Sequence, residues 1–343
     1  MKKTLVETQK RMFSRMLLLC SMIGMLFGFT ACDDDDENPA MKGKPSITVL
    51  LGVNGKGNND YSALIYKAIE KWEKNPNVDM TIYHPKSNEE ATKLYKDWAK
   101  KTANGVKSLM VPANGQFEEV VNNTRLDLKA NQQVLAFEMT LKQPLKGIHS
   151  FEISHPGISY LAGKMASKCD EAVVLIGSRT AMLNEAEAMF HKGYGSDKKY
   201  QAIELSKQFN GFNMPDVAEQ KAKENPDAFI LPLAGLSNNG VYEFLNKCKD
   251  EDKIMAAGMD VNCNSLSTRI PFSYIINIDK AVDLHIQCWY DEKPWPDIVL
   301  GLAEGMTSIV MNPDFTEVAG VSKADFEEIY KKYFDEAAAL DKK

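Results

Sequence analysis

The sequence predicts an α/β protein made of two Rossmann-like lobes, each built on a parallel sheet with helices on both faces. Two observations predict this class. Short β-branched, apolar runs alternate with segments whose apolar residues recur at helical spacing, and this alternation begins a second time near residue 147. The chain of 343 residues is also long enough for two domains. A repeated βαβα pattern of this size places parallel strands in two sheets.

The first half opens with the run SITVLL at residues 46–51, which is typical of a buried strand. Three further strands are expected, at 78–83, 108–111 and 133–137. The helices between them are expected at 64–72, at 87–105 with Ser87 as N-cap, and after Pro112.

The second half is expected to hold strands at 147–153, 172–176, 200–205, 228–233, 253–258 and 273–276. Its helices are expected at 158–167, 183–193, 215–224, 241–249 and 279–289. A last helix at 323–334, capped by Ser322, closes the chain, and the tail 335–343 is expected to fray. Lobe 1 is therefore assigned to residues 45–146 and 273–295, and lobe 2 to 147–272 and 296–343.

Residues 1–31 have the pattern of a bacterial signal peptide. Five basic residues precede the apolar run 16–29, which is too short to span a bilayer comfortably. Phe29-Thr30-Ala31-Cys32 resembles a lipobox, which predicts that Cys32 carries the lipid anchor, palmitate included. The alternative is a plain secretory signal. We expect a cell-envelope lipoprotein held at the membrane, on its periplasmic face or at the outer-membrane surface.

Segment 32–44 is predicted to be an acidic tether, because the run at 33–37 is too charged to pack. It resembles an export address for the outer-membrane surface, and the alternative is a spacer without an address. Without residues 1–31 the chain keeps 36 basic and 46 acidic residues, a net charge near −10. Such a surface argues against nucleic acid and anionic membranes as partners, and we expect a monomer.

The chemistry-bearing residues predict neither a metal site nor a cofactor. Four cysteines follow Cys32, with no CxxC spacing and no nearby histidine pattern, and they are Cys169, Cys248, Cys263 and Cys288. Both disulfides and free thiols are compatible with this pattern. No GxSxG, HExxH, complete GxGxxG or Walker loop is present, so a non-enzyme is predicted. The rival interpretation is a hydrolase that uses Asp60 and Asp260 as paired carboxylates.

Ligands of open parallel sheets bind outside the carboxyl ends of the strands. The residues expected there are amides, hydroxyls, aromatic rings and a few charged groups, which suit a neutral polyhydroxylated or heterocyclic ligand. They are Asn54, Asn59, Asp60, Tyr61, Asn114, Phe117, Phe137, Glu138, Ser178, Arg179, Phe212, Gly235, Ser237 and Asp260. Asn and Gly are also ordinary residues of turns and caps, so the collection carries more weight than any single member.

Several segments, in this order, resemble the basic-membrane-protein, or purine-nucleoside-receptor, lipoproteins, which are solute-binding components of ABC transporters. The resemblance covers roughly residues 46–310. The segments are GKGNNDYSALIYKAIEKW, VLIGSRTAMLNEAEAMFHKGY, NGFNMPDVAEQKA, DAFILPLAGLSNNGVYEFL, and MAAGMDVN before SYIINIDKAV. The resemblance implies the type I periplasmic-binding fold, with two lobes joined by three crossings and a cleft that closes on a small ligand.

The same resemblance implies a purine nucleoside as ligand and an ABC permease as membrane partner. Asp260 would accept hydrogen bonds from ligand hydroxyls, Gly235 would let backbone N–H groups approach, and Phe212 would stack on a flat ring. Two departures bear on the ligand. The family's Lys aligns with Ile276, and its Asn-Asp pair aligns with Ser62-Ala63. A sugar-binding protein or a sensory surface lipoprotein of the same fold is therefore the alternative.

Overall fold

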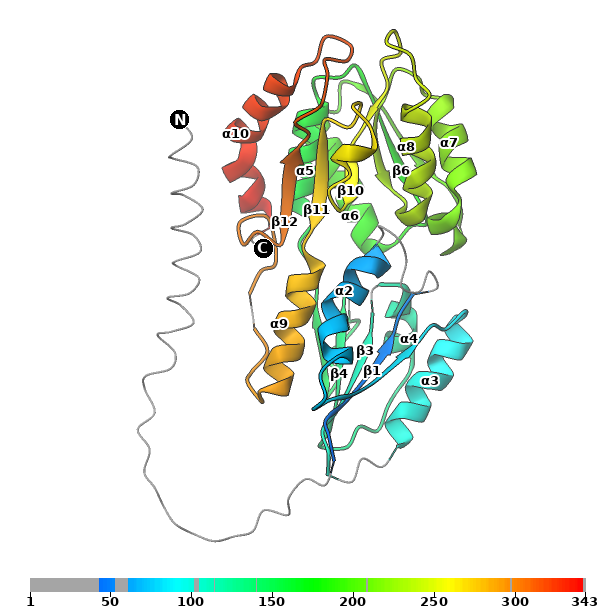
Figure 1. The fold of residues 1–343 in the computed structure, drawn as a ribbon, viewed down its shortest axis with the longest axis vertical. Coiled ribbons are helices and arrows are strands. Elements are labelled where there is room, and N and C mark those ends of the chain that lie inside the picture. Colours follow the sequence, from blue (N-terminus) through cyan, green and yellow to red (C-terminus); the bar gives the residue numbers. More distant parts are fainter. Residues whose placement is uncertain are drawn as a thin grey trace, which may run out of the picture. The chain divides into compact units, whose positions relative to one another are not determined.

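The computed structural model describes residues 43–52, 61–101, 105–113, 115–139, 141–207, 209–296 and 298–341, without the side chains of 61–63 and 209. The predicted signal peptide, Cys32 and nearly all of the tether lie outside these residues. The described chain forms two α/β lobes, which confirms the predicted fold class (Figure 1). Among its helices, none is long and apolar enough to cross a membrane.

Lobe 1 is built on five parallel strands in the order β2-β1-β3-β4-β5. The strands are β1 (Ser46–Leu50), β2 (Asp79–Tyr83), β3 (Ser108–Pro112), β4 (Gln132–Phe137) and β5 (Ile148–Phe151). Because Val134 pairs with Ile148, β5 belongs to this sheet. The first segment of lobe 1 thus continues past the expected boundary at 146, since the strand after the loop adds to the free edge of β4.

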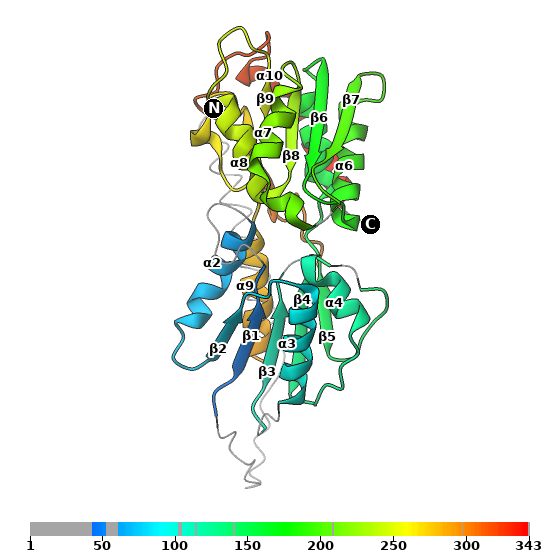
Figure 2. The ribbon, with the colours of Figure 1, turned by 90° about the vertical axis from the view of Figure 1, so that its right-hand side faces the viewer.

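Helices cover both faces of this sheet. Alternate residues of β1 point to opposite sides. Ile47 and Val49 pack with α2 (Tyr61–Glu73) and α9 (Ile278–Tyr290), and Leu50 packs with α3 (Asn88–Lys100) and the short η2 (Gly115–Phe117) and α4 (Glu118–Asn123). Figure 2 shows these two layers on either side of the strands. The helix expected at 279–289 is α9, and it packs beside α2 on this sheet.

Lobe 2 contains a four-stranded parallel sheet in the order β7-β6-β8-β9. Its strands are β6 (Glu171–Ile176), β7 (Lys199–Glu204), β8 (Phe229–Leu233) and β9 (Met255–Ala256). One face packs on α5 (Pro156–Ala166) and α6 (Ala181–Tyr194), and the other on α7 (Pro215–Lys223) and α8 (Asn238–Leu245). The β-strand periodicity explains this split, because Val174 faces α6 while Val173 and Leu175 face α8.

A second, three-stranded sheet in lobe 2 differs from the expectation. Strands β10 (Gly258–Asp260), β11 (Phe272–Ile276) and β12 (Thr307–Met311) form it, and β12 runs antiparallel to β11. Strand β11 therefore belongs to lobe 2, although the boundary at 273 assigns it to lobe 1. Strand β12 was not predicted from the sequence, because only two of its five residues are buried and its apolar pattern is correspondingly weak.

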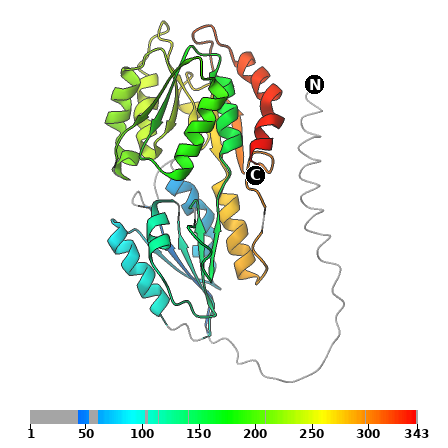
Figure 3. The same cartoon turned by 180° about the vertical axis from the view of Figure 1, so that it is seen from behind.

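The carboxyl-terminal helix α10 (Lys323–Leu340) is longer than expected, and the prediction that 335–343 frays is wrong. Ala337 and Ala338 are buried against α5, and the helix lies along the outer side of lobe 2 (Figure 3). Its start is fixed by a capping box between Ser322 and Asp325, as Ser322 predicts. Its end is fixed by Asp341, which is buried and hydrogen-bonded.

In the described part of the chain, three segments pass between the lobes. The first joins β5 to α5, the second is the turn at Asn277 between β11 and α9, and the third leads from α9 to β12. Ile153 and Leu300 form a parallel bridge between the first and third, and the Asn277 N–H donates to the Met306 carbonyl at 2.8 Å. The three crossings are thus held side by side by backbone hydrogen bonds.

Candidate functional site

The candidate site lies where the carboxyl ends of the strands of both lobes meet. Part of the predicted set cannot be placed there, because four of its members lie outside the described residues. These are Asn54, Asn59, Asp60 and Asn114. Tyr61 begins helix α2, but its side chain is not described.

Phe212 packs against the backbone at the carboxyl ends of β6 and β8. Its ring lies against Gly177, where a Cβ atom would come within 2.5 Å of the ring, and against Gly235, where the distance would be 3.5 Å. Gly235 has φ +57°, a left-handed conformation that glycine adopts without steric cost. A side chain at 177 would displace the ring, so Gly177 lets Phe212 pack directly on the end of β6 while the ring stays partly exposed.

The loop that carries Phe212 is fixed by Ser237. The Ser237 hydroxyl donates to the Gly211 carbonyl at 2.7 Å and accepts from the Met214 N–H at 2.7 Å. Gly211 in turn touches the Gly177 carbonyl, which a Cβ atom would approach to 1.8 Å. Ser237 is fully buried, so its role in this structure is to position Phe212 rather than to contact a ligand.

Two acidic residues at strand ends adopt left-handed backbone conformations. Glu138 follows β4 in lobe 1 with φ +56°, and Asp260 ends β10 in lobe 2 with φ +66°. Non-glycine residues rarely adopt this region, and such strain gathers at functional sites. Both carboxylates act on the same group, because each favours the protonated form of His155. Glu138 contacts His155 directly, and Asp260 at the end of β10 acts on the same ring through its charge.

His155 is the centre of a buried polar network between the lobes. Its Nε2 lies 3.3 Å from Glu138 Oε2, and its Nδ1 lies 3.0 Å from the Tyr274 hydroxyl, which also contacts Ser159 Oγ at 3.2 Å. Burial by itself lowers the pKa of His155, but Glu138, Asp260 and Asp341 together raise it above its ordinary value. Burial also raises the pKa of Tyr274, so its hydroxyl stays protonated.

Asp341 joins three segments at the same junction. Its carboxylate accepts from the N–H groups of Gly157 and Leu302 and from the Ser154 hydroxyl, each at 2.8 Å. Ser154 lies in the first crossing, Gly157 in the first turn of α5, and Leu302 in the third crossing. A carboxylate at a helix amino terminus is also favoured by the helix dipole. Asp341 therefore fastens α10 to two of the crossing segments.

Four of the predicted residues have other roles in this structure. Phe117 and Phe137 are buried in the two hydrophobic cores of lobe 1, and Phe137 stacks on Phe151, so neither ring presents surface to a ligand. The Arg179 guanidinium donates to Asn184 and Glu187 within lobe 2. Ser178 is buried beside Gly211.

Sequence reasoning missed His155, Tyr274 and Asp341. His155 precedes Pro156, which occupies the first turn of α5. A histidine at a helix start that also ends a crossing is a usable signal, but its partner Tyr274 is 119 residues away. Asp341 carried no signal, because its segment was expected to fray.

The described cysteines Cys169, Cys248, Cys263 and Cys288 are free thiols, which settles the pairing left open by the sequence. Burial raises the pKa of Cys169 to about 12, so this thiol is unreactive. The described residues contain no cluster of three His, Cys, Asp or Glu side chains that could hold a metal ion.

No protein-family model matches the chain, and no curated protein is similar to it in sequence. Solved structures are similar in fold. An ABC-transporter solute-binding protein from Aeropyrum pernix K1 has TM-score 0.64 and 14% identity, with 87% of this chain and 89% of that chain covered. A transcriptional activator of the comK gene from Bacillus halodurans has TM-score 0.60 and 15% identity, covering 85% and 98%.

A third similar structure is GanP, a glucose-galactose binding protein from Geobacillus stearothermophilus. Its TM-score is 0.58 at 15% identity, and the match covers 80% of this chain and all (100%) of that chain. Identities this low establish the architecture alone. With its two parallel-sheet lobes and three crossings, the chain has the fold of the periplasmic solute-binding proteins.

Proposed function

We propose that this protein is a non-catalytic solute-binding protein that closes its lobes on a small neutral ligand and delivers it to an ABC permease. One observation carries the proposal. Asp260 is a half-buried acid in a strained backbone conformation at the carboxyl end of β10, and its charge acts on His155 at the junction of the lobes. Strain and a carboxylate at such a point are features of ligand sites in open α/β sheets.

Among ligands, we favour a sugar. GanP is described as binding glucose and galactose, and a solute-binding protein of the same fold from Actinobacillus succinogenes 130z holds D-allose (TM-score 0.56, 12% identity). An aromatic ring and a carboxylate suit a sugar, because the ring covers its C–H face and the carboxylate accepts from two hydroxyls. Ile276, where the nucleoside receptors have Lys, also favours a ligand without a base.

A purine nucleoside remains the second candidate, since it offers the same hydroxyls and a flat base. Calorimetric titration of D-glucose, D-galactose, adenosine and adenine separates the two. Asp260→Asn keeps the left-handed backbone, which Asn tolerates, and should weaken hydroxyl-bearing ligands about tenfold or more. Asp250→Asn, on an exposed turn at the other end of lobe 2, is the matched control and should change nothing.

Phe212→Leu tests the flat-ring contact. Loss of a stack on a base corresponds to roughly 1–3 kcal/mol, so adenosine and adenine should weaken alike while a sugar weakens less. Phe244→Leu, a partly buried ring on α8, is the control. Binding of every ligand unchanged in both Asp260→Asn and Phe212→Leu would refute the proposed site.

Closure and anchoring have separate tests. Ligand-linked closure of rigid lobes should lower the radius of gyration in X-ray scattering at saturating ligand. An unchanged radius would refute a closing binding protein. We also propose the lipid anchor at Cys32, so Cys32→Ala should move the protein from the membrane to the soluble fraction. Persistent partitioning into detergent would refute the lipobox.

A further inference from the structure

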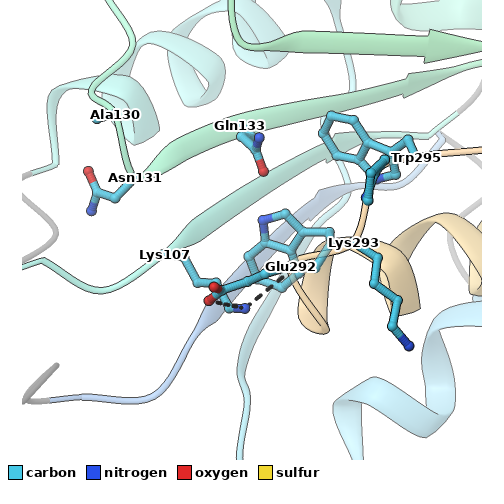
Figure 4. Close-up of a pocket in the computed structure, with 9 residues that line it drawn as sticks. Lys107, Ala130, Asn131, Gln133, Glu292, Lys293 and Trp295 are labelled. Atoms are coloured by element: carbon cyan, nitrogen blue, oxygen red, sulfur yellow. Dashed lines mark hydrogen bonds and ion pairs between the residues drawn. The ribbon is translucent and has the colours of Figure 1, made fainter. Parts of the chain in front are cut away.

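A cavity of about 600 Å³ opens at the base of lobe 1, at the amino ends of its strands (Figure 4). Lys107 and Asn131 precede strands β3 and β4, Gln133 lies at the start of β4, and the opposite wall follows helix α9. The carboxyl-end residue Glu138 is at the other end of the same sheet. This cavity is thus separate from the candidate site between the lobes.

The wall after α9 is built from two tryptophans and one strained acid. Trp289 lies in the last turn of α9 and is 4% exposed, while Trp295 lines the cavity and is half-buried. Glu292 has φ +57° at a position where helices usually place glycine. Glu292, which pairs with Lys107, therefore gives this helix end an unusual backbone conformation.

The side chains of this wall are held in place by their own contacts. Lys107 donates to the Tyr290 carbonyl at 2.6 Å and to Glu292 Oε1 at 3.1 Å, and thereby closes the end of α9. Trp295 donates its indole N–H to the His285 carbonyl at 3.0 Å and stacks on His149, with ring centres 4.4 Å apart. The side chains of the site are already ordered before a ligand binds, so less conformational entropy is lost on binding.

The charge balance favours a neutral ligand. The Lys107 ammonium is paired with Glu292, and Lys293 is paired with Asp291 at 3.1 Å. Gln133 is half-buried, and its amide has no hydrogen bond to another described residue. Indole surface beside an amide and a balanced ion pair suits a ring with an apolar face and hydroxyls at its edge. The volume lies within the roughly 300–1,000 Å³ of small-ligand sites.

We propose that this cavity is a second carbohydrate site, which takes one neutral sugar ring against the partly exposed Trp295, while the nearly buried Trp289 lines the same cavity. The sugar's C–H face covers indole, and its hydroxyls contact Gln133 and the Lys107–Glu292 pair. The occupied site contacts residues 292–295, which begin the third crossing, so it holds that crossing against lobe 1. This goes beyond the proposed function, because the site needs neither Asp260 nor lobe closure.

Fluorine NMR of the full chain labelled with fluorinated tryptophan tests the site. The four tryptophans are Trp72, Trp98, Trp289 and Trp295. Titration with D-glucose and D-galactose should shift Trp289 and Trp295 along one saturable curve, while Trp98, on the buried face of α3, stays fixed. The same shifts should persist in Asp260→Asn, so a failure of the inter-lobe site would leave this result intact.

Two outcomes would overturn the proposal. One is the absence of a saturable shift at about 10 mM sugar, a concentration well above a 1 mM dissociation constant. The other is loss of the Trp289 and Trp295 shifts in Asp260→Asn, which would make them a report of lobe closure.

Gln133→Leu tests the hydroxyl contact without touching the tryptophan wall. It should weaken the sugar roughly fivefold to tenfold while leaving the ligand-free tryptophan spectrum unchanged. Gln201→Leu, an exposed residue on β7 of lobe 2, is the matched control. Equal affinity in Gln133→Leu and Gln201→Leu would remove Gln133 from the site and overturn the proposal as stated.

Discussion

Two buried histidines show how differently the junction of the lobes and the base of lobe 1 are built. His155, at the junction, lies between the Glu138 carboxylate and the Tyr274 hydroxyl, and the surrounding acids raise its pKa. His285, on α9, lies against Phe151 with ring centres 3.8 Å apart, and burial lowers its pKa to about 4. The surroundings of His155 favour its protonated form, while those of His285 favour the neutral ring.

The difference follows from what each region must hold together. The base of lobe 1 lies within one packed core, where stacked neutral rings need no exact partner geometry. At the junction, backbone from three crossings and the end of α10 must meet, and this leaves buried N–H groups that only fixed acceptors can satisfy. Charged, directional bonds therefore define the junction, while apolar stacking fills the lobe.

The largest effect is expected at the junction, from Asp341→Ala. The change leaves the buried N–H groups of Gly157 and Leu302 without their acceptor and removes the bond to Ser154. We expect a loss of about 3–5 kcal/mol in the free energy of unfolding, measured by urea denaturation at neutral pH. Asp335→Ala, exposed on the same helix, should stay within about 0.5 kcal/mol. Similar losses in the two variants would mean that Asp341 does not fasten the junction.

Glu138→Gln should have the next largest effect. The Gln carbonyl can still accept from the Ile153 N–H, but the negative charge beside His155 is gone. Burial then dominates, so the pKa of His155 should fall below its ordinary value, and stability near pH 6 should drop by about 1–3 kcal/mol. An NMR titration of the His155 ring measures the pKa. Glu89→Gln, exposed on α3, is the control, and a His155 pKa that does not move would contradict the pairing.

The same comparison shows what could be inferred from the sequence. The cores of the lobes can be recognised locally, because the spacing of apolar residues shows which face of a strand or helix is buried. This spacing predicted most helices and strands of both lobes. The junction of the lobes has no such local pattern, because Asp341 lies 184 residues from Gly157 and His155 lies 119 residues from Tyr274 in the sequence. Periodicity also says nothing of pairing partners, which is why β5 and β11 were assigned to the wrong lobes.

The candidate site was predictable in type but not in detail. Strand-end reasoning found Phe212, Gly235 and Asp260, because a strand end can be located from its apolar run. It could not separate exposed from buried rings, so Phe117 and Phe137 entered the set although both belong to cores. It also could not show that the Ser237 hydroxyl is already hydrogen-bonded to the backbone of Gly211 and Met214.

The two histidines should give opposite contributions to the pH dependence of stability. His155 has a raised pKa in the folded state, so its contribution is complete below about pH 6.5 and is lost as the pH rises through the folded value. His285 has a lowered pKa, so its contribution is complete above 6.5 and is lost as the pH falls towards about 4. Unfolding free energies of the wild type and Glu138→Gln should therefore converge as the pH rises. A constant difference from about pH 6 to 9 would contradict a raised pKa of His155.

The smallest effect on stability at neutral pH is expected from His285→Phe. This variant tests the histidine whose neutral form is favoured. The change loses the 2.7 Å bond from Nδ1 to the Ala281 carbonyl, worth about 0.5–1.5 kcal/mol. It also removes a buried Nε2 that has no hydrogen-bond partner among the described residues, and it keeps a flat ring against Phe151. These terms nearly cancel, so the neutral-pH stability should change by less than about 1 kcal/mol. Below pH 6.5 the variant should instead become more stable relative to the wild type, because no buried ring must remain unprotonated. Urea denaturation at about pH 7 and pH 5 measures both terms, and a variant that loses stability equally at the two pH values would show that His285 acts through packing alone.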